Sequence, residues 1–322
     1  MTSPRAGVLL CALLLGGCVH VAAPELPQTL PERWQQQPLA DAALPAADLR
    51  GWWRAFKDPL LDQLVSSLLE QNLDLAQAQS RLKQARGLAE ASASEYLPSL
   101  SAGARSVDSA SGRKSYFHAT LDAIWDLGAF GMRDGLALQA QGQAQAAQAE
   151  VQALRVSQIA ELLRHYIALR AAQAQTQNLA AQQALDEQQV ALINARIQAH
   201  QMAASEQEVL ARRQQQTRLA LAASKLEALR AAQAVAALLG RTAADPAWQS
   251  PAPQPLAPAL RIRQVPSDLL RTRPDIWRAE ADVLAAAGDA AQARARLYPR
   301  ITLGASYLFA YDLDTHRKSH VD

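Results

Sequence analysis

The sequence of 322 residues contains only two cysteines, Cys11 and Cys18, both near its beginning. The chain after Cys18 therefore has no disulfide, no cysteine metal site and no thiol nucleophile. Aromatic residues make up 5% of the chain although hydrophobic residues make up 49%. The apolar content is mostly alanine, leucine and valine, which favours close-packed helices over a core of bulky aromatic side chains.

The sequence also lacks an excess of charge and long apolar runs. The formal net charge is +2, whereas a nucleic-acid-binding protein usually concentrates positive charge on one face, so we expect no nucleic-acid partner. No run of about 18 or more apolar residues occurs, so no transmembrane helix is expected after the N-terminus. The sequence has no phosphate-binding glycine loop and no nucleophile with a supporting motif. We therefore expect neither an enzyme nor a cofactor or metal site.

Residues 1–17 are typical of a secretory signal peptide. Arg5 supplies a basic start, and Val8–Leu15 form an apolar segment too short to span a bilayer. Two glycines precede Cys18, and the sequence here resembles the lipobox of bacterial lipoproteins. That resemblance implies cleavage before Cys18, a diacylglyceryl group on its thiol and an acylated amine, which together would anchor the chain to lipid. The alternative is an ordinary signal peptide in which Cys18 has no role.

Proline-rich segments suggest the domain boundaries. Residues 19–50 contain five prolines, and we predict a lipidated, extended tether over residues 18–57. Residues 243–266 contain six prolines and predict a linker. The first structural repeat is then residues 58–242, and a second repeat covers residues 267–322.

The first repeat begins with a helix and a hairpin of two strands. The helix is predicted from Asp58, with Pro59 at its first position, to Glu95. Residues 97–126 alternate between apolar and polar positions, which is typical of strands with one apolar face. Each strand has the ~9–11 residues that a tilted strand needs to cross a bilayer. A hairpin in a soluble sandwich would look the same, and the alternation by itself favours that alternative. The apolar positions are Leu100, Ala102, Ala104, Phe117, Ala119, Leu121, Ala123 and Trp125.

A long helical hairpin is predicted over residues 131–240, which contain no proline. We expect the break between its two arms at residues 199–204, because the capping-box pattern of Ser205–Glu208 marks the start of a new helix. Arms of ~50–100 Å are far longer than a globular helix, and their alanine content is typical of helices that approach closely, as in coiled coils.

The chain repeats itself after the linker. A shift of 201 residues, without gaps, places Asp74 on Asp275, Gly87 on Gly288 and Pro98 on Pro299. We predict a helix and one further strand there. The equivalents of residues 122–240 are not in the chain, so we expect an incomplete second repeat. The fold class is thus mainly α with a small β part, built as a tandem repeat. The apolar positions of the further strand are Ile301, Leu303, Ala305, Tyr307 and Phe309.

With these features, the sequence resembles the outer-membrane factor (TolC-like) efflux family, in its lipoprotein (NodT-type) branch. The resemblance covers about residues 10–311 and rests on motifs in a fixed order. Those motifs are Cys18, Trp52-Trp53, Phe56-Lys57-Asp58-Pro59-Leu60, Asn72-Leu73-Asp74-Leu75, Leu97-Pro98-Ser99-Leu100, Trp125-Asp126-Leu127, Phe130-Gly131, Arg273-Pro274-Asp275-Ile276, Ala279-Glu280, Ala293-Arg294 and Tyr298-Pro299.

The resemblance implies a homotrimer in which strands form an outer-membrane β-barrel and long helices continue it as a periplasmic α-barrel. It implies a passive exit duct for drugs or other small solutes, with a periplasmic adaptor (membrane-fusion) protein and an inner-membrane pump as partners and outer-membrane lipid around the strands. Adaptor contact would involve Arg196 and Ser205 at the hairpin tip, although the glycine frequent there in the family is absent. Because the second repeat is incomplete, we expect this polypeptide alone to form no functional duct.

Other classes of protein remain open. The strongest alternative is a lipid-anchored periplasmic coiled-coil structural lipoprotein whose strands pair outside the membrane. His316 and His320 have the spacing of helical metal ligands, but a solvated polar tail explains them better. The basic stretch of the second helical arm, which includes Arg212 and Arg213, is interpreted as a solvated helix face.

Overall fold

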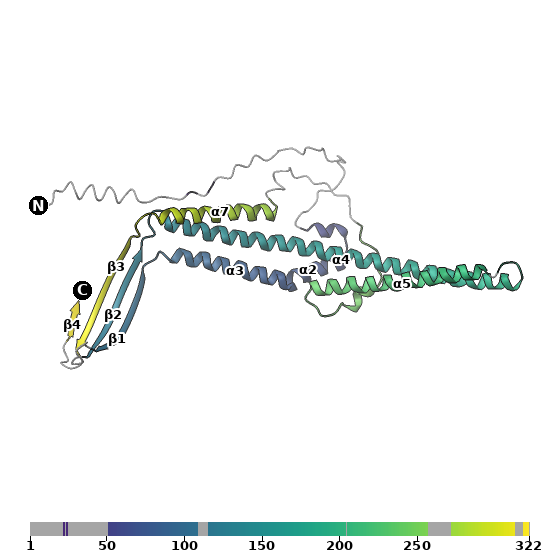
Figure 1. Ribbon diagram of the computed structural model, residues 1–322, viewed down its shortest axis with the longest axis horizontal. Helices are drawn as coiled ribbons and strands as arrows, with labels where there is room; N and C mark the ends of the chain where they lie inside the picture. The colour runs from purple at the N-terminus through teal and green to yellow at the C-terminus, as the bar shows by residue number, and fades with distance from the viewer. Residues whose placement is uncertain are drawn as a thin grey trace. The chain divides into compact units, whose positions relative to one another are not determined.

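The computed structural model describes residues 22, 24, 51–108, 115–203, 205–256, 272–312 and 318–321 (Figure 1). It confirms the mainly helical fold with a small β part. Contacts divide the chain into two compact units, and each unit combines segments that are far apart in the sequence. The two compact units therefore do not coincide with the two repeats predicted from the sequence, residues 58–242 and 267–322. The helices are η1 (Trp52–Phe56), α2 (Pro59–Gln71), α3 (Leu73–Ser94), α4 (Met132–Gln198), α5 (Ser205–Leu238), η2 (Pro246–Gln249) and α7 (Pro274–Ala295), and the strands are β1 (Ser99–Asp108), β2 (Ser115–Asp126), β3 (Thr302–Asp312) and β4 (Lys318–Val321).

One unit, residues 30–79 and 151–269, contains the main hydrophobic core. Helix α2 begins where the sequence predicts it, because the Asp58 carboxylate accepts hydrogen bonds from the backbone N–H groups of Leu60 and Leu61 at 3.0 and 3.2 Å. Its apolar residues recur at helical spacing and are buried against α4 and α5. Burying each such leucine or valine contributes about 1.5–3 kcal/mol. The largest fully buried members are Leu61, Val65, Leu68, Leu162, Tyr166, Leu169, Val235 and Leu239.

The predicted extended tether over residues 18–57 is wrong at its C-terminal end. Residues Trp52–Phe56 form the 3-10 helix η1, and the Trp53 side chain is 7% exposed within the core cluster. A buried tryptophan removes a large apolar surface from water, which holds this short segment against the core although its local sequence favours no regular structure.

The helix predicted from Asp58 to Glu95 is also wrong in one respect, because it is interrupted at Asn72. The Asn72 backbone is extended there, with φ −67° and ψ 124°. Its side-chain oxygen accepts from the Leu75 N–H at 2.9 Å, and its amide nitrogen donates to the Leu238 carbonyl at 2.8 Å. Asn72 therefore caps α3 and fixes its start to the end of α5.

The long helical hairpin has the predicted form. Helix α4 ends at Gln198 and α5 begins at Ser205, so the break falls within residues 199–204. The backbone reverses at His200, which has a φ of 55°. Four buried residues of α5 recur every seven positions, which is the spacing of a coiled-coil seam, and they are Leu210, Thr217, Ser224 and Ala231. Towards the end of α5, Ala232, Val235 and Ala236 are buried as well.

In the other unit, residues 80–150 and 270–322, helix α7 lies along α4 in close contact (Figure 1). A methyl group added at Gly142 would lie 2.5 Å from the Ala285 nitrogen, so the two backbones approach directly. Glycine at this position is therefore required by packing, at the usual cost in helix propensity.

The four strands form one antiparallel sheet in the order β1-β2-β3-β4. The hairpin β1–β2 lies within the predicted range 97–126. The expectation of a single strand in the second repeat is wrong, because β4 pairs with β3 over Leu308–Tyr311. The segment was interpreted as a solvated polar tail, but strand pairing uses backbone groups and needs no apolar side chains.

Candidate functional site

The predicted apolar positions of the strands come together on one face of the sheet. Residues directly opposite each other on antiparallel strands share a face. The register places Leu121 between Ala102 and Tyr307, and the neighbouring rows are just as apolar. These rows are Leu100–Ala123–Ala305, Ala104–Ala119–Phe309 and the pair Trp125–Leu303.

This apolar sheet face is exposed to its surroundings. Leu100 is 70% exposed, Leu303 is 53% exposed and Leu121 is 45% exposed. The opposite face is more polar, although Ile124 on it is 55% exposed. Its row Ser101–Asp122–Ser306 is polar throughout, and the Ser306 hydroxyl donates to the Asp122 carboxylate at 2.5 Å. A large exposed apolar patch marks a surface that is covered by a membrane or a partner.

Ile301, the first apolar position predicted for the further strand, precedes β3 by one residue. Pairing begins at Thr302 opposite Asp126, which is the last residue of β2. The Ile301 carbonyl still accepts from the Leu127 N–H at 3.1 Å. The strand thus starts where its partner ends.

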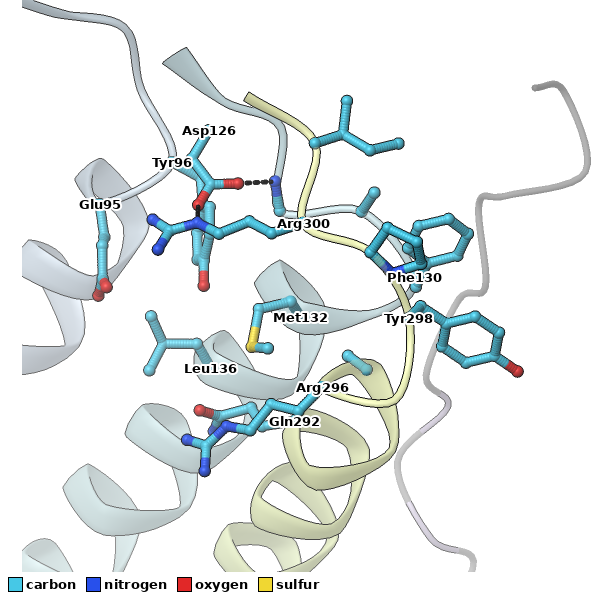
Figure 2. Close-up of a pocket in the computed structure, with 15 residues that line it drawn as sticks. Glu95, Tyr96, Asp126, Phe130, Met132, Leu136, Gln292, Arg296, Tyr298 and Arg300 are labelled. Atoms are coloured by element: carbon cyan, nitrogen blue, oxygen red, sulfur yellow. Dashed lines mark hydrogen bonds and ion pairs between the residues drawn. The ribbon is translucent and has the colours of Figure 1, made fainter. Parts of the chain in front are cut away.

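A cavity of about 390 Å³ lies at the junction between this sheet and the helices of its unit (Figure 2). It is lined by the end of α3, the start of α4 and the end of α7. Arg300 donates through Nε to the Asp126 carboxylate at 2.5 Å, and the Gly128 N–H donates to the other carboxylate oxygen at 3.0 Å. These contacts fix the turn between β2 and α4 against the start of β3. Asp126 belongs to the motif Trp125-Asp126-Leu127 quoted for the family resemblance, whereas its contacts with Arg300 and Gly128 were not predicted from the sequence.

Tyr96 lies beside this turn and is buried. Its carbonyl accepts from the Trp125 indole N–H at 3.0 Å, and a methyl group at Gly128 would lie 2.7 Å from its ring. Burial raises the pKa of the Tyr96 hydroxyl, and the carboxylates of Glu95 and Asp126 raise it further. The hydroxyl is therefore neutral at physiological pH and serves as a structural group.

The end of α4 and the start of α5 meet at one end of the helical hairpin (Figure 1), and the two predicted tip residues lie there. Arg196 is in the last turn of α4 and Ser205 is the first residue of α5, and both side chains are exposed. The Arg196 carbonyl accepts from the Gln201 N–H at 2.8 Å, which closes the end of α4.

A buried carboxylate lies inside the helical hairpin, and sequence reasoning missed it. Asp186 accepts from the Gln182 amide at 2.8 Å and from the Thr217 hydroxyl at 2.9 Å, and the Arg213 guanidinium lies 3.2 Å away. Burial favours a raised pKa, but these hydrogen bonds and the positive charge prevail and hold the Asp186 pKa below its ordinary value. Arg213, which was interpreted as part of a solvated face, is thus the ion-pair partner of Asp186.

Some predicted features lie outside the described residues, including Cys18, the signal peptide and His316. His320 lies in strand β4, so it does not have the helical geometry that a metal-ligand spacing of four residues requires. Within the described ranges, no group of three histidine, cysteine or acidic residues is arranged to hold a metal ion. In the same part of the chain, no helix combines the length and hydropathy needed to cross a membrane.

Residues 64–241 match the family model described as outer membrane efflux protein. The chain is 30% identical to the pyoverdine export outer membrane protein OpmQ of Pseudomonas aeruginosa, over 95% of this chain and 68% of that protein. It is 29% identical to nodulation protein T of Rhizobium leguminosarum bv. viciae, over 97% of this chain and 66% of that protein. The chain thus spans about two thirds of the length of these relatives.

Solved structures show the same fold. The outer-membrane channel OprN superimposes with a TM-score of 0.79 at 27% identity, over 94% of this chain and 71% of that chain. The transmembrane channel CusC superimposes with a TM-score of 0.74 at 22% identity, over 93% of this chain and 71% of that chain. The similarity to CusC concerns the fold alone.

Proposed function

Because the chain belongs to the outer membrane efflux protein family, we propose that its sheet contributes to a membrane-spanning β-barrel and its helices to a periplasmic duct. The chain is an outer-membrane component of an efflux system. The observation that carries the proposal is the alignment of apolar side chains from β1, β2 and β3 on one exposed face. In lipid every backbone polar group needs a partner, and a closed barrel provides one for each strand.

The sheet edges point to assembly with further copies. Among the strands that the structure describes, β1 lies at one edge of the sheet and β4 at the other, so the outer side of each has no strand partner within the described ranges. A trimer in which these edges join strands of neighbouring copies would close the barrel. This proposal departs from the expectation that the polypeptide alone forms no functional duct, because β4 adds a fourth strand to the sheet. The polar face, with Asp122 and Ser306, would then line a water-filled lumen.

The remaining assignments extend this proposal to anchor, partners and cargo. Cys18 would carry the lipid, and the exposed tip residues Arg196 and Ser205 would contact a periplasmic adaptor protein that links the duct to an inner-membrane pump. The names of the relatives refer to pyoverdine export and, for a protein of Pseudomonas putida, to toluene efflux. We infer a small organic solute as the exported substrate.

Extraction from membranes tests the proposal. In a Cys18→Ala variant directed to the periplasm by a conventional signal peptide, the lipid anchor is absent. If the strands insert, the protein still fractionates with the outer membrane and needs detergent for release. Release by an aqueous carbonate wash would support a structural lipoprotein held by its lipid and would overturn the proposal.

A matched pair of substitutions in the Cys18→Ala background sharpens this test. Leu121→Arg places a charge on the apolar face near the middle of β2, where insertion would cost about 2–4 kcal/mol. Thr120→Arg places the same charge on the opposite face. We expect Leu121→Arg to lower the membrane-inserted fraction and Thr120→Arg to leave it unchanged. Equal behaviour of the two variants would contradict the assigned orientation.

A further inference from the structure

The cavity at the junction between the sheet and the helices is large enough for a ligand. Its volume of about 390 Å³ is far above the ~10–15 Å³ that one water molecule requires, and it lies within the ~300–1,000 Å³ of small-molecule sites. The residues that line it all belong to one compact unit, residues 80–150 and 270–322. Neither the barrel nor the duct of the proposed function assigns a role to this cavity.

A buried tyrosine presents its hydroxyl to the cavity. Tyr96 is 8% exposed, and Figure 2 shows its hydroxyl pointing into the space lined by Leu136 and Met132. No side chain or backbone group of the described residues forms a hydrogen bond with this hydroxyl. Buried polar groups in folded proteins are nearly always hydrogen-bonded, so this hydroxyl indicates a partner inside the cavity.

The cavity carries charges of both signs near this hydroxyl. Glu95 follows α3 and Arg296 is the C-cap residue of α7, and both side chains are exposed. Burial raises the pKa of the Tyr96 hydroxyl most, Glu95 raises it further and Arg296 opposes this rise, so both charges act at the hydroxyl. Within the described ranges, neither Glu95 nor Arg296 forms an ion pair. One cation and one anion beside the same cavity favour a ligand that carries both charges.

The cavity lies where the exposed apolar face of the sheet ends. Strand β2 ends and β3 begins beside it. Ile301 lines the cavity, and Leu303, two residues later, is 53% exposed on the apolar face. Phe130 and Tyr298 also line it, and their rings stack with centroids 4.9 Å apart. Aromatic side chains at the end of an apolar strand face are typical of the boundary between lipid and water.

We propose that this cavity binds the zwitterionic headgroup of a phospholipid, a phosphodiester joined to a primary ammonium group, from the leaflet that faces the periplasm. The inference rests on the proposed function, which places the sheet in lipid and the helices in the periplasm. The Arg296 guanidinium and the Tyr96 hydroxyl donate to the phosphate, and the Glu95 carboxylate accepts from the ammonium group. The acyl chains extend along the apolar sheet face.

Charge complementarity sets the expected lipid preference. Hydrogen bonds between ionised groups are stronger than those between neutral groups, so a headgroup that satisfies both Arg296 and Glu95 is favoured. A purely anionic headgroup leaves Glu95 without a cation and places a second negative charge near it. A quaternary ammonium group supplies the charge but has no N–H to donate to the carboxylate.

Lipid retention by the full chain tests the proposal. The protein is purified in detergent, incubated with mixed micelles of phosphatidylethanolamine, phosphatidylglycerol and phosphatidylcholine in equal amounts, and purified again. Mass spectrometry then quantifies the lipid that remains bound. We expect phosphatidylethanolamine to exceed each of the other two about fivefold or more. Equal retention of the three lipids, or no retained phosphatidylethanolamine, would overturn the proposal.

Substitutions in the cavity locate the binding. Arg296→Gln should lower the retained phosphatidylethanolamine about fivefold or more, because the phosphate loses its cation. Tyr96→Phe should lower it as well, since it removes the hydroxyl and keeps the ring. Glu95→Gln should remove the preference for phosphatidylethanolamine over phosphatidylglycerol.

Arg294→Gln is the matched control, because Arg294 is an exposed arginine of α7 that does not line the cavity. It should leave both the amount and the preference unchanged. An equal loss of phosphatidylethanolamine in Arg294→Gln and Arg296→Gln would show that binding is not at this cavity and would contradict the proposal.

Soluble phosphoethanolamine distinguishes a lipid from a free solute with the same headgroup. Added in large excess, it should not displace the retained lipid, because it has no acyl chains to bury against the sheet. Displacement would assign the cavity to a soluble phosphate ester and overturn the lipid assignment. The detergent requirement of the Cys18→Ala variant reports separately on the proposed function. A protein that inserts but retains the three lipids equally would therefore contradict this inference alone.

Discussion

Tyr166 is the residue on which several elements of the helical unit converge. Its hydroxyl donates to the Asp58 carboxylate at 2.5 Å, and the Arg170 guanidinium donates to its oxygen at 3.2 Å. Asp58 caps α2, and Arg170 also donates to the Ser250 carbonyl at 3.0 Å. One buried phenol thus connects α2, α4 and the segment after η2.

Tyr166→Phe should lower the free energy of unfolding by about 1–3 kcal/mol, because the Asp58 carboxylate loses a buried donor. Thermal unfolding in detergent, followed by circular dichroism, measures this change. Tyr298→Phe is the control, since Tyr298 is half exposed. An equal effect of the two substitutions would contradict the role assigned to the Tyr166 hydroxyl.

Because the Tyr166 hydroxyl is buried and hydrogen-bonded, we also expect the stability of the protein to fall at alkaline pH. Burial, together with the hydrogen bond to Asp58, raises its pKa to about 12. The folded state therefore favours the protonated phenol, so this stabilisation is complete below the unfolded pKa of about 10 and is lost as pH rises towards 12. The pKa of Tyr96 is raised as well, so ultraviolet absorbance should show more than one tyrosine that ionises late, and Tyr166→Phe should remove one of them. A titration unchanged by that substitution would count against the assignment.

Asp186 should make the stability of the protein fall at acid pH, whereas Tyr166 makes it fall at alkaline pH. Its pKa is lowered in the folded state, so its contribution to stability is present above the unfolded value of about 3.9 and is lost as pH falls through the folded pKa. Asp186→Asn should flatten the dependence of the thermal midpoint on pH in this acid range. Glu187→Gln, at the exposed neighbouring position, should leave that dependence intact.

At the scale of elements, the contact between α4 and α7 depends on glycine. Gly142→Ala adds a better helix former, yet its methyl group would lie 2.5 Å from the Ala285 nitrogen. We expect a destabilisation of about 1–3 kcal/mol from overpacking, which outweighs the gain of about 1 kcal/mol in helix propensity. Chemical denaturation in detergent measures whether Gly142→Ala raises or lowers the free energy of unfolding. A stabilised Gly142→Ala protein would show that the two helices are not in direct backbone contact.

Local patterns predicted the elements whose residues carry their own periodicity. The alternation of residues 97–126 predicted β1 and β2, and the capping-box pattern at Ser205–Glu208 placed the break before α5. Features that depend on contacts with residues distant in the sequence, such as the break between α2 and α3, were not predictable in this way. Asn72 ends one helix and starts the next because its amide reaches Leu238, far away in the sequence. Trp53 is held mainly by the core that it enters, most of whose other members are distant in the sequence.

The candidate site was also predictable in its local patterns but not in its contacts between distant segments. Alternation identified the apolar positions of β1, β2 and β3, but their alignment into shared rows depends on a register that local sequence does not encode. No local feature distinguishes the buried Asp186 from the exposed Glu187 beside it. The ion pair between Arg300 and Asp126 joins residues from the two repeats, and it forms only because β3 pairs with β2.

At the scale of the whole molecule, the tandem repeat explains the arrangement of the chain. Strands from the two repeats form one sheet, and α7 of the second repeat packs on α4 of the first. Each compact unit therefore contains segments from distant parts of the sequence. Local composition indicated a succession of repeats and linkers, whereas the compact units follow from which helix faces fit together.

Cysteine labelling across β2 is the most direct test of the account. The chain has two cysteines, so a Cys11→Ala, Cys18→Ala background directed by a conventional signal peptide allows single cysteines to be placed from Ala119 to Ala123. A membrane-impermeant maleimide is then applied to isolated outer membranes. The account predicts labelling at Thr120 and Asp122, which face water, and protection at Ala119, Leu121 and Ala123, which face lipid. Uniform labelling of all five positions would contradict it.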